Sequence, residues 1–316
     1  MSFHGYHHIT STVTSARGDV EFHVGLLGLR NVKRTVVLDG SRPFYHLYYG
    51  NEHGEPGTLL TSFAFGPDRP EGRKGSGQVS SIALSVPAGS LGFWEDRLVA
   101  YDVSATPFEL LGERRLRLHH PDGIEYQLVE TPVDQRLPWT GADVPAAAAV
   151  RGVHSVTVCT REIDELEMFL HEGMGLRTRD TDGAVTSYTM AAGDAGQVVE
   201  IDHQPDVAQG TWGYMRNTVD HVAFDVREAQ AQLSFKDRLE AMGYIDVTEP
   251  RDRNYFYSVY FRTPAEAMFE ATRSHPQGFL KDESLDSLGS CLQLPSWLEE
   301  RQDELLAELL RTQPLD

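Results

Sequence analysis

Short stretches of alternating apolar and polar residues recur along the chain, and several are followed by a segment with helical spacing. Residues 78–86 alternate as a strand does, and residues 91–98 repeat their apolar positions as a helix does. The same succession occurs at residues 218–226 and 229–242. Further stretches rich in aromatic and β-branched residues predict additional strands containing residues 45–49, 115–118, 198–201 and 257–261. The pattern predicts a repeated unit of one helix and several strands.

Glycine spacing identifies two further copies of this unit. The separation of Gly5 from Gly28 equals that of Gly152 from Gly175, and a helical pattern lies between the glycines in each copy. Self-similarity at a fixed spacing is a sign of repeated structural modules. The chain is therefore predicted to be an α+β protein built from four βαβββ modules, at residues 5–66, 77–131, 151–204 and 218–273.

The four modules suggest two paired domains and a tail. Residues 1–136 would form the N-terminal domain and residues 151–273 the C-terminal domain, joined by the Pro- and Ala-rich linker 137–150. The tail, residues 274–316, contains a predicted helix that opens near Pro295. Leucines at helical spacing in this tail indicate a packing surface, with partner binding as the alternative.

Aligning the modules places potential ligands at equivalent positions. The first-strand position holds His8, Ser81, Ser155 and His221, and the last-strand position holds Thr61, Gln127, Glu200 and Glu270. In this fold two modules that face each other form a cup-shaped site. A cup formed by the first and fourth modules would contain His8, His221 and Glu270. Two imidazoles and a carboxylate form the facial triad that holds non-haem Fe(II). A cup formed by the second and third modules would be a poor site for a transition metal.

His154 is an alternative third ligand, which would make the third and fourth modules the active pair. In the ungapped alignment, however, His154 matches His7 rather than His8. Neighbouring side chains on a regular strand point to opposite faces. On this argument His154 points away from the ligand position, and His8 is preferred.

The modules and their ligands resemble the vicinal oxygen chelate superfamily, which includes glyoxalase I, bleomycin-resistance proteins and extradiol dioxygenases. More narrowly, the chain resembles the hydroquinone ring-cleaving dioxygenases of that superfamily. The matching stretches are at residues 7–10, 45–50, 56–61, 251–256, 260–262 and 294–298. The resemblance covers nearly the whole chain.

The resemblance implies roles for residues around the metal. His7 would be an acid/base or hydrogen-bonding group and Tyr260 a donor to a bound oxygen, although both residue types also pack structurally on strands. Arg253 would orient an anionic substrate or support Tyr260. Thr10, on the face of His8, and Phe224 are candidate substrate-binding residues, although an apolar residue such as Phe224 more often belongs to the core.

These observations favour a ring-cleaving dioxygenase that uses Fe(II), with Mn(II) as the alternative, and takes O₂ and a small hydroquinone-like or catechol aromatic. A glyoxalase-like isomerase or lyase is the enzymatic alternative. By resemblance it would need a fourth protein ligand, and Thr61 is a poor one. An aromatic-binding resistance protein is the non-enzymatic alternative, but sequestration does not require intact metal ligands.

Composition limits the partners. The 316 residues carry a net charge of −19, which disfavours nucleic acid and anionic membrane surfaces. We expect no membrane span or signal segment, because no apolar run is long enough. The two cysteines show no motif spacing, which suggests a reduced, cytoplasmic protein. The oligomeric state stays open, a homo-oligomer included.

Overall fold

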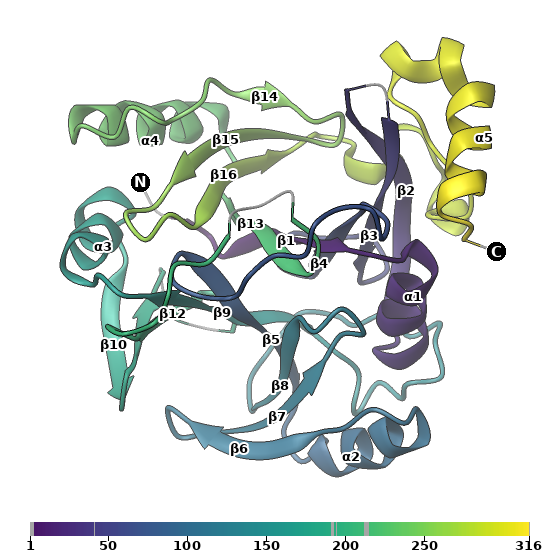
Figure 1. The fold of residues 1–316 in the computed structure, drawn as a ribbon. Helices are drawn as coiled ribbons and strands as arrows, with labels where there is room; N and C mark the ends of the chain where they lie inside the picture. Colours follow the sequence, from purple (N-terminus) through teal and green to yellow (C-terminus); the bar gives the residue numbers. More distant parts are fainter. Residues whose placement is uncertain (1–2, 41, 191–192, 194, 212–214, 316) are drawn as a thin grey trace.

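The computed structural model describes residues 3–40, 42–190, 193, 195–211 and 215–315, whose strands form two curled eight-stranded sheets (Figure 1). The first sheet has the order β14 (Arg251–Asp252), β15 (Phe256–Arg262), β16 (Met268–Ser274), β13 (Thr218–Asp225), β1 (Tyr6–Val13), β4 (Leu59–Ala64), β3 (Arg42–Gly50) and β2 (Arg30–Asp39). The second has the order β10 (Arg177–Asp182), β11 (Val185–Thr189), β12 (Val198–His203), β9 (Gly152–Thr160), β5 (Gln78–Pro87), β8 (Glu125–Thr131), β7 (Glu113–His119) and β6 (Thr106–Leu110).

Each sheet combines one module from the N-terminal half of the chain with one from the C-terminal half. The first and fourth modules meet where β1 and β13 pair antiparallel, and the second and third meet where β5 and β9 pair antiparallel. The α+β fold of four βαβββ modules and the predicted pairing of modules into cups are confirmed. Both sheets contain strands from both halves of the chain, and the division at the linker 137–150 stays a prediction.

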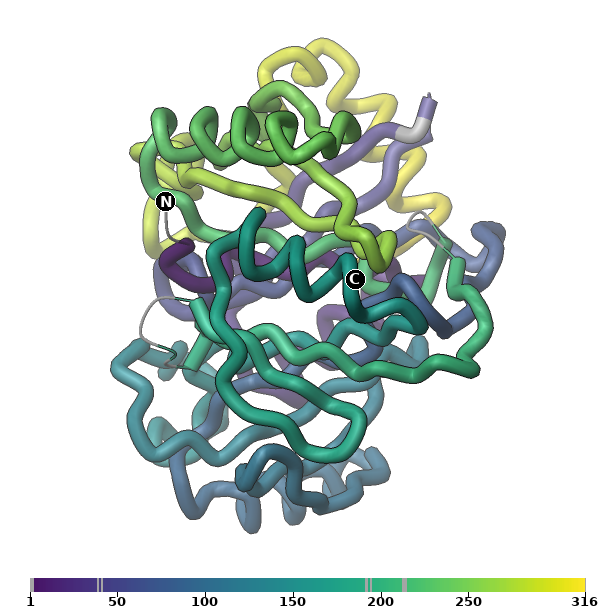
Figure 2. The backbone as a smooth tube through the Cα atoms, turned by 90° about the vertical axis from the view of Figure 1, so that its left-hand side faces the viewer, coloured from purple at the N-terminus to yellow at the C-terminus, as the bar shows by residue number. Residues whose placement is uncertain are grey.

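The helices cover the sheets and connect their strands. They are α1 (Ala16–Val20) with the π-helical turn η1 (Glu21–Leu26), α2 (Leu91–Ala100), α3 (Asp164–Met168) with η2 (Phe169–Gly173), α4 (Ala229–Ala241) and α5 (Gln302–Thr312). Figure 2 shows α3 and α4 on the same side of the molecule, where Phe169 of η2 contacts Tyr244 and Phe261. This contact ties the third module to the fourth across the two sheets.

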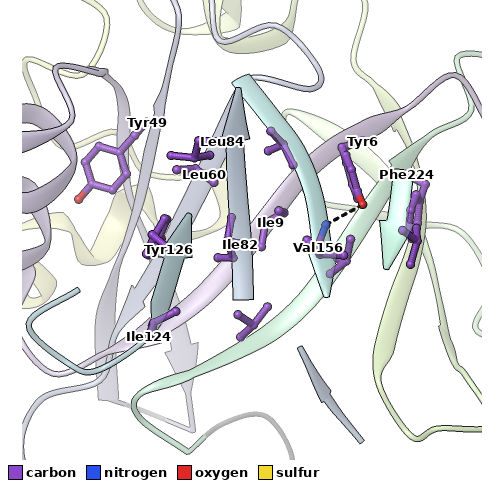
Figure 3. Packing of buried hydrophobic residues seen from close by; sticks show 14 of the residues in the cluster. Tyr6, Ile9, Tyr49, Leu60, Ile82, Leu84, Ile124, Tyr126, Val156 and Phe224 are labelled. Carbon is purple, nitrogen blue, oxygen red and sulfur yellow. Dashed lines mark hydrogen bonds between the residues drawn. The ribbon is translucent and has the colours of Figure 1, made fainter. Parts of the chain in front are cut away.

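A hydrophobic core lies between the two sheets. Apolar side chains of β1, β5, β9 and β13 meet there, and Figure 3 shows Ile9, Ile82 and Val156 among them. The Tyr6 hydroxyl crosses this interface and accepts a hydrogen bond from the Val156 backbone N–H at 3.0 Å. The other face of each central strand is left for the interior of its cup.

The tail packs against the first sheet. Short 3₁₀ turns, η3 (Gly278–Lys281), η4 (Leu285–Ser287) and η5 (Ser296–Arg301), precede α5, which lies beside β2 and β3 (Figure 1). Of the five leucines at helical spacing in the tail, Leu298, Leu305 and Leu309 are buried, which confirms their predicted packing role, whereas Leu310 is half exposed. The α-helix itself begins at Gln302, because the segment after Pro295 turns as a 3₁₀ helix.

No helix in the described part of the chain is both long and apolar enough to span a bilayer.

Two glycines explain the repeat seen in the sequence. Gly5 and Gly152 have φ of +134° and +147°, and each opens the first strand of its module. The next residue donates its backbone N–H across to the other sheet: Tyr6 to Gly196 and Val153 to Gly57, at 3.0 and 2.9 Å. A Cβ on Gly152 would lie 2.4 Å from the Gly57 carbonyl oxygen. The close backbone crossing therefore requires glycine.

We predict that Gly152→Ala lowers the free energy of unfolding by roughly 3 kcal/mol, because the clash adds to the strain of positive φ. Gly183→Ala is the matched control: Gly183 has φ +59°, and a Cβ there meets nothing within 4 Å. The control should lose about 1 kcal/mol. Equilibrium denaturation measures both, and equal losses would contradict the role given to the crossing.

Candidate metal centre

A β-bulge near the start of β1 sets the orientation of two histidines. The pairing of β1 with β13 shifts register between Tyr6 and His8. The extra residue turns the strand, so that Tyr6 and Ile9 both face the core while His7 and His8 lie side by side. The Nδ1 atoms of His7 and His8 are 3.0 Å apart. The bulge thus brings His7 to the site, which a regular strand would not do.

His8, His221 and Glu270 converge in the cup of the first sheet. Nε2 of His221 lies 3.2 Å from Nε2 of His8 and 3.2 Å from Glu270 Oε1, and His8 Nε2 lies 3.7 Å from Glu270 Oε2. Exposed fractions are 1%, 6% and 0% for the three residues. The structure therefore brings together the three predicted ligands, from three adjacent strands, within reach of one ion.

Strand register accounts for this convergence. The positions that the sequence alignment made equivalent also pair in the same way in all four modules. In every module, the residue two after the first-strand position pairs with the last-strand position. The pairs are Thr10 with Thr61, Ala83 with Gln127, Thr157 with Glu200 and Ala223 with Glu270. Equal register gives each module the same geometry, so chemistry differs only through residue identity.

The three side chains fit a metal ion. Glu270 Oε1 is buried and has no hydrogen-bond partner among the described residues, while Oε2 accepts from Thr272 Oγ1 at 3.0 Å. Two imidazole nitrogens and this oxygen point at one another, an arrangement that a shared cation stabilises.

Outer partners hold both imidazoles with Nε2 facing inward. Asp220 Oδ1 is 3.0 Å from His221 Nδ1, and His7 Nδ1 is 3.0 Å from His8 Nδ1. His7 Nε2 in turn lies 2.9 Å from Ser274 Oγ. Such partners fix the ring orientation and tautomer of metal-binding histidines.

The electrostatics also suit a cation. Burial, followed by the neighbouring histidines, holds the pKa of His8 well below its usual value, and burial lowers the pKa of His7 to about 3. Both rings are therefore neutral at neutral pH. Burial also opposes the charging of His221, but the Glu270 and Asp220 carboxylates outweigh it and raise that pKa. The excess of negative charge around His221 attracts a positive ion.

Tyr260 and Arg253 lie beside the triad as a linked pair. The Arg253 guanidinium donates from Nε to the Tyr260 hydroxyl at 2.9 Å and stands 5.0 Å over its ring. Burial, then the Glu270 carboxylate, raises the pKa of Tyr260 well above its usual value, so its hydroxyl stays protonated. The pair places a protonated oxygen and a fixed positive charge at the cup.

A cavity of about 340 Å³ opens beside the triad. Aromatic and apolar side chains form most of its wall, and the tail residues Pro295, Trp297 and Leu298 close one side. Its polar wall residues from β2 and β3 are Thr35, His46 and Tyr48. These three residues were not identified from the sequence. Alternation along a strand places His46 and Tyr48 on one face, but it does not show whether that face lines the cavity. Nothing in the sequence linked the distant tail to the cavity.

Thr10 and Phe224 do not line this cavity, and the expectation that they contact substrate is corrected. Thr10 is fully buried behind the triad, where its hydroxyl lies 2.7 Å from that of Thr61. Phe224 packs in the core against Tyr6 and Phe269. The bulge places Phe224 opposite Tyr6, so both rings face the other sheet.

The fourth ligand position is occupied by a hydroxyl that is already bonded. Thr61 Oγ1 lies 3.2 Å from His46 Nε2 as well as close to Thr10. A neutral threonine with two such partners is a poor ligand beside two imidazoles and a carboxylate. The cup therefore offers three protein ligands.

In the second cup a guanidinium fills the centre. Arg115, fully buried, donates to both Glu200 oxygens, at 2.7 and 3.2 Å, and to Gln127 and Glu113. The Ser155 and Thr157 hydroxyls complete the shell around Glu200. Arg115 supplies the positive charge that a metal would supply, and it was not identified from the sequence.

His154 belongs to this second cup. Ala83 pairs with Ser155 and Leu84 with Val153, so His154 is the extra residue of a bulge in β9, and its Nε2 lies 3.4 Å from Glu113 Oε1. The argument that it points away from the ligand position was therefore wrong, because the strand is not regular. It is nevertheless remote from His221 and Glu270, since the two cups are in different sheets.

A third buried group, Asp19, His23 and His120, joins the first and second modules. The Asp19 carboxylate accepts from the Tyr49 and Ser62 hydroxyls, at 2.6 and 3.0 Å. His23 Nδ1 lies 3.0 Å from the Asp19 carbonyl oxygen. Protein partners therefore hold Asp19 and His23. His120 Nε2 has no hydrogen bond among the described residues but lies 3.3 Å from Asp19 Oδ1, and we describe the group as a structural network between the two modules.

Named relatives are similar to this chain in sequence along nearly its whole length. No protein-family model matches the chain. It is 38% identical over 305 residues to the chlorohydroquinone/hydroquinone 1,2-dioxygenase of Sphingobium indicum, covering 96% of this chain and 94% of that protein. It is 35% identical over 306 residues to the "Putative ring-cleaving dioxygenase MhqO" of Bacillus subtilis, covering 97% of this chain and 96% of that one.

Solved structures agree. A crystal structure titled "putative dioxygenase" from Bacillus subtilis superposes with a TM-score of 0.91 at 34% identity, over 99% of this chain and 98% of that one. Glyoxalase I from Zea mays matches with a TM-score of 0.63 at 12% identity, over 85% and 92%, and shows the fold alone. The fold and the cup define a member of the vicinal oxygen chelate superfamily. Within it, the chain belongs to the family of ring-cleaving dioxygenases, enzymes that act on a small aromatic substrate and O₂.

We predict that His8→Ala removes stoichiometric metal binding, because two ligands hold an ion far less well than three. The matched control is His154→Ala. His154 lies in the other cup, at the repeat position next to that of His8, and the variant should bind metal as the wild type does. Elemental analysis after metal loading and desalting measures both. A metal-free His154→Ala beside a metallated His8→Ala would reverse the assignment of the cups.

We also predict that Arg115→Met destabilises the fold by roughly 3–5 kcal/mol, because it leaves Glu200 buried and unpaired. The double variant Arg115→Met with Glu200→Gln should recover most of this loss. Denaturant unfolding reports stability, and metal content should stay that of the wild type in both. An unchanged stability in the single variant would contradict the role of Arg115 as the central charge.

Proposed function

We propose that this enzyme is an Fe(II)-dependent, extradiol-type dioxygenase that cleaves the ring of a hydroquinone-like or catechol aromatic, with Mn(II) as the alternative metal. The observation that carries the proposal is the convergence of His8, His221 and Glu270 with a bonded threonine at the fourth position. Three protein ligands leave coordination positions for both a ring oxygen and O₂, and the ion there would supply the electronic coupling between them.

Two features support an aromatic diol as substrate. Aromatic and apolar side chains form most of the cavity wall, which suits a flat apolar ring. The relative from Sphingobium indicum is named for chlorohydroquinone and hydroquinone. Together they favour a para-diphenol over an aliphatic substrate.

Tyr260 would hold a proton for the substrate oxygen. Its hydroxyl accepts from Arg253, so its own hydrogen is available to donate within the cup, where the Glu270 carboxylate is a neighbouring acceptor. The raised pKa keeps that hydrogen on the phenol oxygen at neutral pH. A donor aimed at an oxygen that gains negative charge stabilises the transition state more than the ground state.

Arg253 would act on the substrate through its positive charge, and His7 would act by holding the imidazole of His8 in place. The guanidinium at the cavity wall favours an anionic form of the substrate and steadies Tyr260. His7 lies between His8 and Ser274 and would keep the imidazole of His8 in the tautomer whose Nε2 is free to bind the ion.

We predict that the enzyme, loaded anaerobically with Fe(II), consumes O₂ with hydroquinone or catechol and does not turn over the methylglyoxal–glutathione adduct. An oxygen electrode and an isomerase assay on the same preparation decide this. Isomerase turnover with Zn or Ni, without O₂ uptake, would contradict the proposal and favour a glyoxalase-like reaction.

We predict that Tyr260→Phe retains iron but loses about two to three decades in turnover, because only one hydrogen-bond donor is removed. Iron content should stay that of the wild type, since the hydroxyl is not a ligand. Tyr257→Phe, on the same strand but outside the cavity wall, is the matched control and should remain active. Wild-type oxygen uptake in Tyr260→Phe would show that Tyr260 is only a packed aromatic.

A further inference from the structure

The cavity beside the triad contains a hydroxyl whose hydrogen bonding is incomplete. Thr35 on β2 is 5% exposed and lines the cavity, yet its Oγ1 has no hydrogen-bond partner among the described residues. A buried hydroxyl without a partner costs roughly 1–3 kcal/mol. Valine would fill the same volume without this cost. The presence of the hydroxyl therefore suggests that a bound ligand supplies its hydrogen-bond partner.

Strand register places Thr35 on the cavity side of its strand. Thr35 pairs directly with His46 of β3, and opposed residues of an antiparallel pair share a face. His46 is already engaged, with Nε2 3.2 Å from Thr61 Oγ1 and Nδ1 3.0 Å from the Tyr48 hydroxyl. Thr35 is therefore the group in this polar wall that is left to bind something in the cavity.

Thr35 lies at the end of the cavity remote from the triad. In the sheet order β13-β1-β4-β3-β2, three strand spacings separate β1, which carries His8, from β2. At about 4.8 Å each, they amount to roughly 14 Å between backbones. The side chain of His8 spans part of this distance. His8, His221 and Thr35 all line the same cavity, so a small ring bound at the triad extends toward β2.

We propose that Thr35 Oγ1 hydrogen-bonds the hydroxyl at the far end of the substrate ring and thereby selects a para-diol over an ortho-diol. This inference rests on the proposed function, in which the first hydroxyl binds the ion. A para-diol has its second oxygen at the opposite end of the ring, where Thr35 lies. The second oxygen of an ortho-diol is on the adjacent carbon and stays beside the triad, out of reach of Thr35.

The hydroxyl of threonine suits this task because it both donates and accepts, as a phenol does. The neighbouring wall residues Val37 and Phe63 are apolar. A second hydroxyl placed against those residues would lose its hydrogen bonds to water without replacement. Thr35 thus favours one position of the second hydroxyl, and Val37 and Phe63 disfavour positions against their own side chains.

The test compares Thr35→Val, which keeps the shape and removes the hydroxyl, with Thr35→Ser, which keeps the hydroxyl. Dissociation constants of hydroquinone, catechol and 4-methylphenol are measured without oxygen on the iron-loaded full-length protein. We expect Thr35→Val to bind hydroquinone roughly fivefold more weakly, the effect of one neutral hydrogen bond, and to bind the other two ligands as the wild type does. Thr35→Ser should retain the affinity for hydroquinone.

Three results would overturn the assignment: unchanged hydroquinone binding in Thr35→Val, an equal loss for all three ligands, or no wild-type preference for hydroquinone over 4-methylphenol. The first would make the hydroxyl structurally neutral, and the second would make it a general packing group. Failure of the proposed function appears separately, as a wild-type enzyme that binds hydroquinone but takes up no O₂. In that case the selective effect of Thr35→Val would still stand.

Discussion

The antiparallel pairing of β1 with β13 is the contact on which the site depends. It joins modules at opposite ends of the chain and sets His8 beside His221, while the parallel pairing of β13 with β16 adds Glu270. Neither module contains a complete ligand set. The site therefore forms only in the folded protein, and its precision comes from strand register rather than from a local motif.

The two cups show how one scaffold solves the same electrostatic problem twice. Each buries a carboxylate at the last-strand position, Glu270 in one and Glu200 in the other, and a buried carboxylate requires a positive partner. Arg115 provides that partner in the second cup through hydrogen bonds to both Glu200 oxygens. No arginine reaches Glu270 in this way among the described residues, and two histidines converge on it instead. A cup whose carboxylate is paired with arginine is structural, whereas the cup whose carboxylate faces two histidines can hold a metal ion.

The fold and the three ligands were predictable from the sequence because both follow from periodicity. Repeated spacing gave the modules, and equal register put His8, His221 and Glu270 at equivalent positions. A local bulge that turns His7 toward the site was conceivable from the sequence, but that bulges exist at both His7 and His154 follows only from the pairing of β1 with β13 and of β9 with β5. The composition of the cavity wall could not be predicted either, because Trp297 belongs to a tail that has no periodic relation to the modules.

The most direct test of this account is a crystal structure of the iron-loaded protein with anomalous scattering recorded at the iron edge. The account predicts one strong peak bonded to His8 Nε2, His221 Nε2 and Glu270, with the second cup occupied by the Arg115 guanidinium. A peak at Glu113, His154 and Glu200, or at Asp19, His23 and His120, with none at the first triad, would contradict it.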